Sequence, residues 1–284
     1  MYFRKRNGWS VLIFVLAFAF AAKAADVTGT WVIQDLQIAN KVQLSLNVVR
    51  DGNGTFNSSS ALDVSQLRGL ALAQMATPIG TMARFELVRE AGTFACEGYF
   101  KAGNGAGTFL FRSDPGFIQQ MRALGFMDIN ENRLFSMAVH DVGPRFAAEI
   151  RTTGITVSKA DQLVAMRIHG VTVEFIRNLQ QAGYRPQEED LVRMRIHGVT
   201  ADFANQVQRM YPAASLEDLV RMRIHGVGLD FAGDVRQMYA TASIEDLVRL
   251  RIHGVTTDYI RNMQSRSKNM TLEQVVRLKI HGIE

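Results

Sequence analysis

The sequence predicts an α+β protein, in which an N-terminal antiparallel β-rich domain is followed by an array of α-helical hairpins with a 28-residue period. Two patterns carry this prediction. Apolar residues alternate with polar ones from Val42 to Val48, which is the period of a half-buried strand. From His169 onward a histidine–glycine pair recurs every 28 residues, which indicates a repeat architecture. The 47% hydrophobic content excludes a wholly disordered chain.

Residues 1–24 have the composition of a secretory signal peptide. Basic residues at positions 4–6 precede an apolar stretch at positions 11–22, and small residues stand at positions 22 and 24. The alternative is a membrane anchor, but a span needs about 20 apolar residues. We therefore expect a periplasmic or secreted protein with no stable membrane span after the signal is removed.

The export signal also holds most of the excess positive charge. The full chain has 32 basic and 27 acidic residues, a net charge of +5, and its pI is about 9.5. Residues 1–24 contain four basic residues and no acid, so 28 basic residues and a net charge of +1 remain after export. Charge therefore does not by itself predict an anionic partner.

Residues 25–113 form the predicted β-rich domain. The first alternating strand leads into turn-forming residues at 51–54, and a second alternation begins at Phe85. The glycine-rich residues 103–107 predict another turn, and residues 63–75 predict a short helix. The domain is thus an antiparallel sheet with one apolar face and a covering helix, or a small half-open barrel.

The single cysteine excludes a disulfide-stapled fold. Cys96 shares a strand face with Phe94 and Phe100, where a free cysteine is usually a small buried hydrophobic residue. The alternative is an intermolecular disulfide. The glycine run at 103–107 lacks the helix and the Lys-Ser/Thr of a phosphate-binding loop, so it predicts a turn instead.

Residues 114–284 form the predicted helical repeat domain, with the array beginning near residue 116. The repeated histidine–glycine pairs lie in segments such as LVRMRIHGV, and His140 opens a degenerate copy 29 residues before His169. Ser215 with Asp218 resembles a capping box at the start of the first helix of a unit. Gly226 stands where a left-handed residue would end that helix.

The second helix of each unit begins at a capping residue. Thr172, Thr200 and Thr256 occupy this position, and Gly228 replaces threonine once. One helical hairpin is too small to bury its own core. Stacked neighbours must complete it, which predicts an α-solenoid or a compact superhelical stack.

Arginines in the first helices are predicted to point into the packing interface. On a helical projection, the apolar arc around Leu191 extends to Ile196, and Arg195 falls inside this arc. A buried guanidinium needs a carboxylate partner. We therefore expect ion pairs between the five equivalent cations and the acids in the first turn of the second helices. The cations are Arg167, Arg195, Arg223, Arg251 and Lys279, and the acids are Glu174, Asp202, Asp230 and Asp258.

The repeated histidines favour a structural role. One histidine per unit places neighbours about 10 Å apart, whereas zinc needs ligands at about 2 Å. A histidine in the last helical turn interacts favourably with the helix dipole. The alternative is a ligand-binding or pH-responsive row. The sequence predicts no catalytic residue, no metal site and no cofactor.

The segment HGVGLDFA, residues 225–232, resembles the helix-hairpin-helix nucleic-acid module. That resemblance implies backbone N–H groups directed at phosphate. The sequence departs from the module in its second glycine, which survives only as Gly228. It departs again where the module favours a basic residue, because Asp202 and Asp230 are acidic there. These acids argue against nucleic acid as a partner.

A second resemblance covers nearly the whole exported chain. GTW near Trp31, FELVREAGTFACEGYF at residues 85–100 and the repeated RIHGVT resemble exported bacterial proteins with HGVT repeats. Similar regions occur attached to antibiotic-sensing membrane metallopeptidases. The resemblance implies a sensory or interaction role outside the cytoplasm, and it implies no catalytic residue because the zinc-binding motif of those peptidases is absent.

We therefore predict an exported, non-enzymatic protein that binds a protein or peptide partner in envelope sensing or regulation. The alternatives are a helix-hairpin-helix-like nucleic-acid binder and a small-ligand site in the β domain lined by Phe94, Phe100 and Phe109. The candidate interaction face is an outward row of arginines and histidines: Arg193, His197, Arg221, His225, Arg249, His253, Arg277 and His281. The row also fits a solvated face with i,i+4 ion pairs, such as Glu217 with Arg221.

Overall fold

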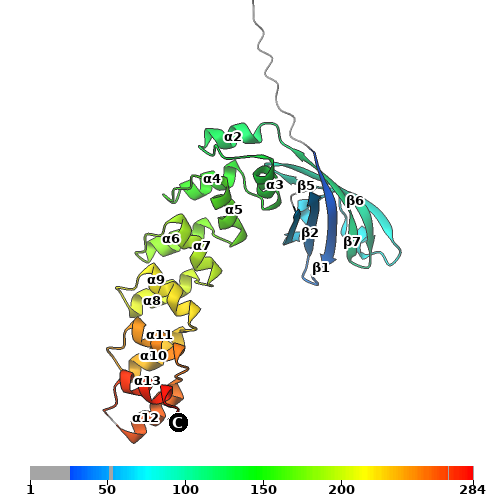
Figure 1. The fold of residues 1–284 in the computed structure, drawn as a ribbon. Helices are drawn as coiled ribbons and strands as arrows, with labels where there is room; N and C mark the ends of the chain where they lie inside the picture. Colours follow the sequence, from blue (N-terminus) through cyan, green and yellow to red (C-terminus); the bar gives the residue numbers. More distant parts are fainter. Residues whose placement is uncertain (1–25, 51–53, 268, 284) are drawn as a thin grey trace, which may run out of the picture.

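The computed structural model describes residues 26–50, 54–267 and 269–283. As predicted, the protein is α+β: a curled antiparallel sheet is followed by a run of helices that leads away from it (Figure 1). The last strand ends at Ser113 and the next helix begins at Phe117. The predicted signal peptide and residues 51–53 of the predicted turn lie outside the described residues.

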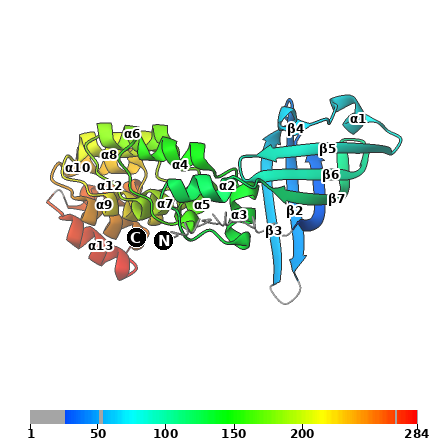
Figure 2. The same ribbon diagram turned by 90° about the horizontal axis from the view of Figure 1, so that it is seen from above.

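Seven strands form one sheet within the described residues. They are β1 (Val27–Asp35), β2 (Lys41–Arg50), β3 (Gly54–Asp63), β4 (Leu67–Arg68), β5 (Thr81–Arg89), β6 (Gly92–Lys101) and β7 (Asn104–Ser113). Their order across the sheet is β3-β2-β1-β7-β6-β5-β4. β1 pairs with β2 and with β7, so the first and last strands of the sequence meet inside the sheet. β3 and β4 follow each other in the sequence but lie at the two open edges of the sheet. Figure 2 shows β2 and β3 projecting from the sheet as a long hairpin.

Aromatic side chains fill the inner face of the curled sheet and extend into the first helices. The Trp31 and Phe85 rings lie 5.0 Å apart, and Phe94 and Phe111 lie 4.7 Å apart. Phe135, from helix α3 (Glu131–Val139), packs edge-on against Phe94 and Phe111 at 5.8 and 5.4 Å. The sheet and the helices consequently share one hydrophobic core.

Two predictions for the β-rich domain were wrong in detail. The turn before β7 is confined to Ala102 and Gly103, and the remaining glycines of that run belong to the strand. A Cβ on Gly107 would lie 2.0 Å from the Glu97 carbonyl oxygen, so the close approach of β6 and β7 requires glycine there. Residues 63–75 form several short elements instead of one helix: a 3-10 turn (Val64–Gln66), β4, and α1 (Leu72–Ala76).

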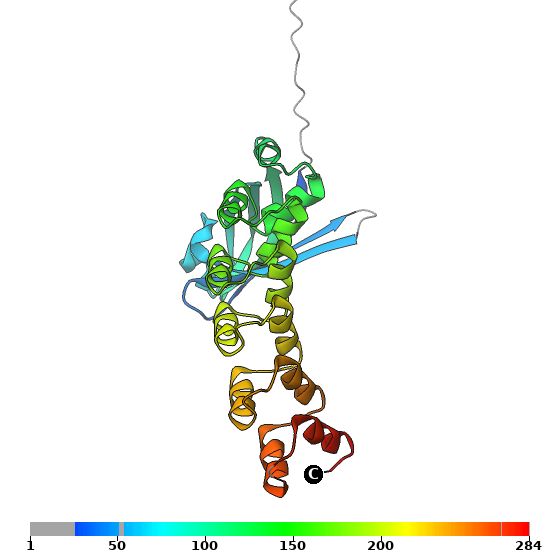
Figure 3. The same cartoon turned by 90° about the vertical axis from the view of Figure 1, so that its left-hand side faces the viewer.

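The helical part begins with α2 (Phe117–Ala123), α3 and α4 (Pro144–Arg151). It continues with α5 (Ala160–Ile168), α6 (Val173–Gln181), α7 (Glu188–Ile196), α8 (Ala201–Met210), α9 (Leu216–Ile224), α10 (Leu229–Met238), α11 (Ile244–Ile252), α12 (Thr257–Arg266) and α13 (Leu272–Ile280). Odd-numbered helices from α3 to α13 contact one another in succession, as do α6, α8, α10 and α12. Figure 3 shows these two sets as two columns.

The predicted helix caps are confirmed. The Ser215 hydroxyl accepts from the Asp218 backbone N–H at 3.1 Å, and the Asp218 carboxylate accepts from the Ser215 N–H at 2.9 Å. Thr200 accepts from the Phe203 N–H at the start of α8. Gly228 begins α10 without a side-chain cap. These caps pair the N–H groups that a helix start leaves unsatisfied.

One carboxylate joins the sheet to the helices. Asp141, which follows α3, lies 3.6 Å from the Arg89 guanidinium of β5 and 3.1 Å from that of Arg167 in α5. The Arg89 side chain is 8% exposed. Burial lowers its pKa while Asp141 opposes this effect, so the ion pair keeps a charged group inside the junction. Asp141 has a φ of +55°, at the sequence position where the later helices are followed by glycine.

Replacing this carboxylate should weaken the junction. We expect Asp141→Asn to lower the free energy of unfolding by about 1–3 kcal/mol, because it leaves the buried Arg89 without a counter-charge. Urea-induced unfolding measures the change. Arg89→Met in the Asp141→Asn background should recover part of the loss, since it removes the buried charge. A double variant no more stable than Asp141→Asn alone would contradict this role of the pair.

Candidate functional site

A left-handed glycine turn ends each odd-numbered helix from α5 to α13. At α7, the Val199 N–H donates to the Met194 carbonyl at 2.8 Å and the Gly198 N–H donates to the Arg195 carbonyl at 3.1 Å. Gly198 has a φ of +71°. This is the Schellman arrangement, in which the residue after the glycine packs against the last turn of the helix. Val199 is accordingly fully buried.

The turn exposes a row of isoleucines. The last residue of each odd-numbered helix from α5 to α13 is isoleucine, and the side chains are 51–55% exposed: Ile168, Ile196, Ile224, Ile252 and Ile280. We call these five residues the isoleucine column. The sequence prediction placed Ile196 in the packed arc, which was wrong, because Val199 takes the interior position. The histidine–glycine pair in the sequence could have indicated that Val199, and not Ile196, takes the interior position.

The predicted ladder of ion pairs between arginines and first-turn acids was also wrong. Within residues 26–50, 54–267 and 269–283, no ion pair joins Arg195, Arg223, Arg251 or Lys279 to Glu174, Asp202, Asp230 or Asp258. Arg167 pairs with Asp141, an acid that the prediction did not include. Arg167, Arg195 and Lys279 are half-buried, as the prediction of an interior position requires in part. Arg223 and Arg251 are exposed, so the prediction was wrong for them.

Each cation of this set lies over an aromatic ring of the preceding even-numbered helix. The Arg195 guanidinium is 5.2 Å from the Phe175 ring centre, and Arg223 is 5.2 Å from that of Phe203. The same contact joins Arg167 to Phe146, Arg251 to Phe231, and Lys279 to Tyr259. We call these pairs the cation–ring contacts. A ring quadrupole attracts a cation without the strict geometry of an ion pair.

The guanidinium groups also touch the glycine turns. Arg195 Nε donates to the His169 carbonyl at 3.3 Å, and Arg251 Nε donates to the Gly226 carbonyl at 3.0 Å. A Cβ on Gly226 would lie 3.5 Å from an Arg251 nitrogen. Each such contact therefore links an odd-numbered helix to the C-terminal end of the odd-numbered helix before it.

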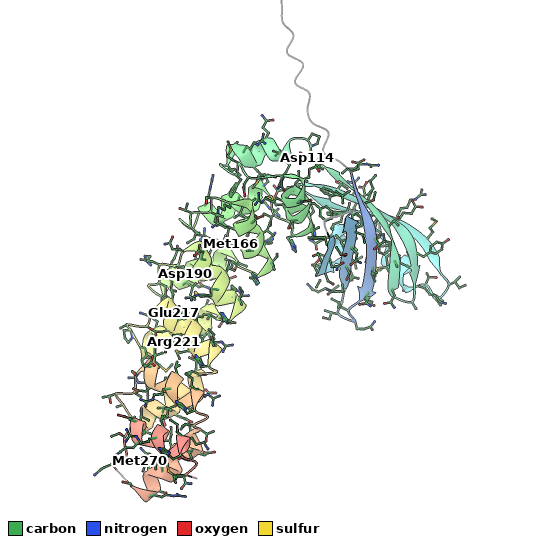
Figure 4. All side chains as sticks on the ribbon, viewed as in Figure 1. Asp114, Met166, Asp190, Glu217, Arg221 and Met270 are labelled. Atoms are coloured by element: carbon green, nitrogen blue, oxygen red, sulfur yellow. The ribbon has the colours of Figure 1, made fainter. Side chains whose placement is uncertain are left out.

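Two of the four arginines of the predicted interaction face form ion pairs between neighbouring helices. Arg193 pairs with Glu217 of α9, and Arg221 pairs with Glu245 of α11 at 2.6 Å. Arg277 pairs with Glu273 one turn away in α13. Arg249 is exposed. Figure 4 labels Glu217 and Arg221 on α9, which takes part in two of these links. Glu217 binds Arg193 in place of the expected Arg221.

The histidines follow the isoleucine column along the same helix ends. His169 and His225 are half-buried, whereas His197, His253 and His281 are exposed. In the described part of the chain, their imidazoles make no hydrogen bond or ion pair. Among those residues, no group of three or more His, Cys, Asp or Glu is arranged to hold a metal ion.

The three phenylalanines of the alternative ligand site belong to the packed core. Phe94 and Phe100 are fully buried, and the Phe94 and Phe109 rings lie 5.5 Å apart. A hollow of about 1020 Å³ lies on the sheet, and of the three phenylalanines only Phe109 lines it. It is lined in part by Arg84 and Glu97, which pair with each other at 3.2 Å. Cys96 is buried and unpaired, and burial raises the pKa of its thiol to about 12.

Comparisons with known proteins return no relative for this chain. No model of a protein family matches it, and neither do curated proteins or solved structures. Within the described ranges, no helix has the length and apolar character that crossing a membrane requires.

Alanine substitutions at two glycines, one just after α9 and one inside α10, should change the stability in opposite directions. Gly226→Ala should lower the free energy of unfolding by about 1–2 kcal/mol, because a Cβ strains the left-handed conformation, in which Gly226 has a φ of +67°. Gly233 lies inside α10 with no atom within 4 Å of a Cβ. Gly233→Ala is the matched control and should raise the stability by about 0.5–1 kcal/mol. Urea unfolding of both variants checks this, and equal effects would contradict the assigned role of the turn.

Stability should depend on the protonation of His140, the residue before Asp141. Burial lowers the pKa of His140 below its ordinary value of 6.5. The unfolded chain then binds a proton more readily than the folded chain, so the free energy of unfolding falls as the pH drops through about 6.5. His140→Gln should reduce this loss between pH 7.5 and pH 5.5 in urea unfolding. Met127→Gln, at an exposed side chain, is the control and should keep the wild-type pH dependence.

Proposed function

We propose that this protein is a non-enzymatic scaffold that binds a protein or peptide partner through the isoleucine column. The single observation that carries the proposal is the recurrence of a half-exposed isoleucine at the same place in five stacked helices. A lone exposed apolar residue needs no explanation, but an aligned set favours an interaction surface. A partner that covers these side chains would gain about 1 kcal/mol from each of them.

We further propose that α5 to α13 are units of a helical solenoid with a 28-residue period. The spacing supports this, because α5, α7, α9, α11 and α13 begin at residues 160, 188, 216, 244 and 272. The cation–ring contacts and the Schellman turns recur with the same spacing. A solenoid presents an extended surface to which every unit adds one equivalent contact. The isoleucine column is such a surface.

The proposed place of action is the cell envelope or the medium, and the proposed role is sensing or regulation. The signal-like composition of residues 1–24 and the resemblance to exported HGVT-repeat proteins support export. The proposal includes no catalytic residue, cofactor or metal. Arg193 and Arg221 are instead occupied by ion pairs, and Arg195 by a ring contact, within the helical part.

Nucleic acid is a weaker candidate for the partner. Phosphate would approach the N-termini of the even-numbered helices, as in the helix-hairpin-helix module. Glu174, Asp202, Asp230 and Asp258 are exposed in the first turns of those helices. Their carboxylates would repel a phosphate backbone.

Substitution of the column should abolish binding without unfolding the protein. We expect the triple variant Ile196→Ser, Ile224→Ser and Ile252→Ser to weaken partner binding at least about tenfold, from three lost apolar contacts. The partner is first identified by affinity capture from envelope extract on the chain without residues 1–24. Its dissociation constant is then measured with each purified variant.

A second triple variant serves as the matched control. Met82→Ser, Val88→Ser and Tyr99→Ser change three similarly exposed apolar side chains of the sheet. This variant should bind like the wild type. Equal affinity for the wild type and the isoleucine variant, at equal urea midpoints, would show that the column is not the binding surface.

A further inference from the structure

Strand β3 is an edge strand whose outer side is open. It pairs with β2 over its whole length, and no other described strand pairs with it. The backbone of residues 55–62 makes no hydrogen bond to any other described segment. At one end of β3, a hollow of about 450 Å³ lies between Thr55 and Phe56 and the residues Arg133 and Ser136 of α3. The outer N–H and C=O groups of β3 are therefore available to another strand.

The edge also lacks the usual protection against pairing. Sheet edges are commonly blocked by charged residues, proline or a covering element. Residues 54–62 of β3 read GTFNSSSAL and contain neither a charge nor a proline, and the one charged residue of the strand is Asp63 at its end, which pairs with Lys41 of β2. On one face Asn57 and Ala61 are exposed, and on the other Phe56 and Leu62 are half-buried against the core. The same β3 edge thus has a polar face and an apolar face.

The residue order of β3 is self-complementary. If two copies of the strand pair antiparallel about Ser59, residue numbers of opposed positions add up to 118. Phe56 then lies opposite Leu62 of the second copy, Asn57 opposite Ala61, and Ser58 opposite Ser60. Apolar side chains meet apolar ones at both ends of the pairing, and small polar ones meet in its centre. Because the segment is uncharged, the two identical strands do not repel each other.

We propose that a second copy of this chain occupies the β3 edge, in a two-fold antiparallel pairing centred on Ser59. The symmetry axis is perpendicular to the sheet, so the inner faces of both sheets stay on the same side. A two-fold pairing uses the β3 edge of both copies and closes on itself, so it yields a dimer and not a filament. The dimer joins the two curled sheets along their β3 edges.

Two double variants test the pairing and its register. Asn57→Lys with Ala61→Lys places ammonium groups opposite each other twice, whereas Asn57→Lys with Ala61→Glu places opposite charges there. Sedimentation equilibrium at up to about 100 μM populates even a weak dimer. We expect the wild type to dimerise, the first variant to dimerise at least about tenfold more weakly, and the second to dimerise at least as tightly as the wild type.

A cysteine reports the same contact independently. Ser59→Cys should form a disulfide-linked dimer on mild oxidation, because Ser59 faces its own copy across the axis and Cys96 is buried. Ser45→Cys lies on the neighbouring strand β2, beside Ser59, and is the matched control with little cross-linking expected. The proposal is overturned if the wild type stays monomeric, or if both double variants dimerise equally. A dimer that Ser59→Cys fails to cross-link would likewise place the interface elsewhere.

Discussion

A glycine in the left-handed conformation follows each odd-numbered helix from α5 to α13, and the arrangement of these helices depends on that turn. At Gly198 the turn closes two backbone hydrogen bonds and directs Val199 inward. It also turns the preceding isoleucine outward and leaves a glycine surface on which the Arg223 guanidinium rests. The burial of the valine, the exposure of the isoleucine and the contact with the next helix thus have one local cause, the left-handed turn. Glycine adopts this turn at the least conformational cost.

Asp141 stands after α3 at the position that glycine occupies after the later odd-numbered helices, and there it also serves as an ion-pair partner. The residue adopts the left-handed conformation without being glycine, and its carboxylate reaches both the sheet and α5. Aspartate tolerates this conformation better than most residues with a Cβ. The strain of the left-handed conformation is offset because the Asp141 carboxylate neutralises the buried Arg89. Glycine has no side chain that could do so. Together with Phe135 in the aromatic core, this carboxylate makes the first helices part of the structure of the sheet.

Local chemistry was predictable from the sequence, whereas the choice among packing partners was not. The capping residues and Gly226 depend only on neighbours within a few positions, and they were predicted correctly. The partner of Arg195 depends on whether a carboxylate or an aromatic ring of another helix lies nearer. The spacing of residues along the sequence does not determine this distance. The exposure of Ile196 followed from the path of the chain after the helix. A helical projection treats the last turn as if the helix continued, so it assigned Ile196 to the core.

Neither of the two surfaces proposed for recognition relies on charge. The arginines of the helical part are largely engaged within it, over rings or with glutamates of the next helix. Ion pairs at exposed positions contribute little stability but neutralise the surface. The isoleucine column and the β3 edge offer apolar contacts and backbone hydrogen bonds respectively. Recognition at such surfaces depends on shape and on strand register, so it should vary little with salt, unlike binding to a polyanion.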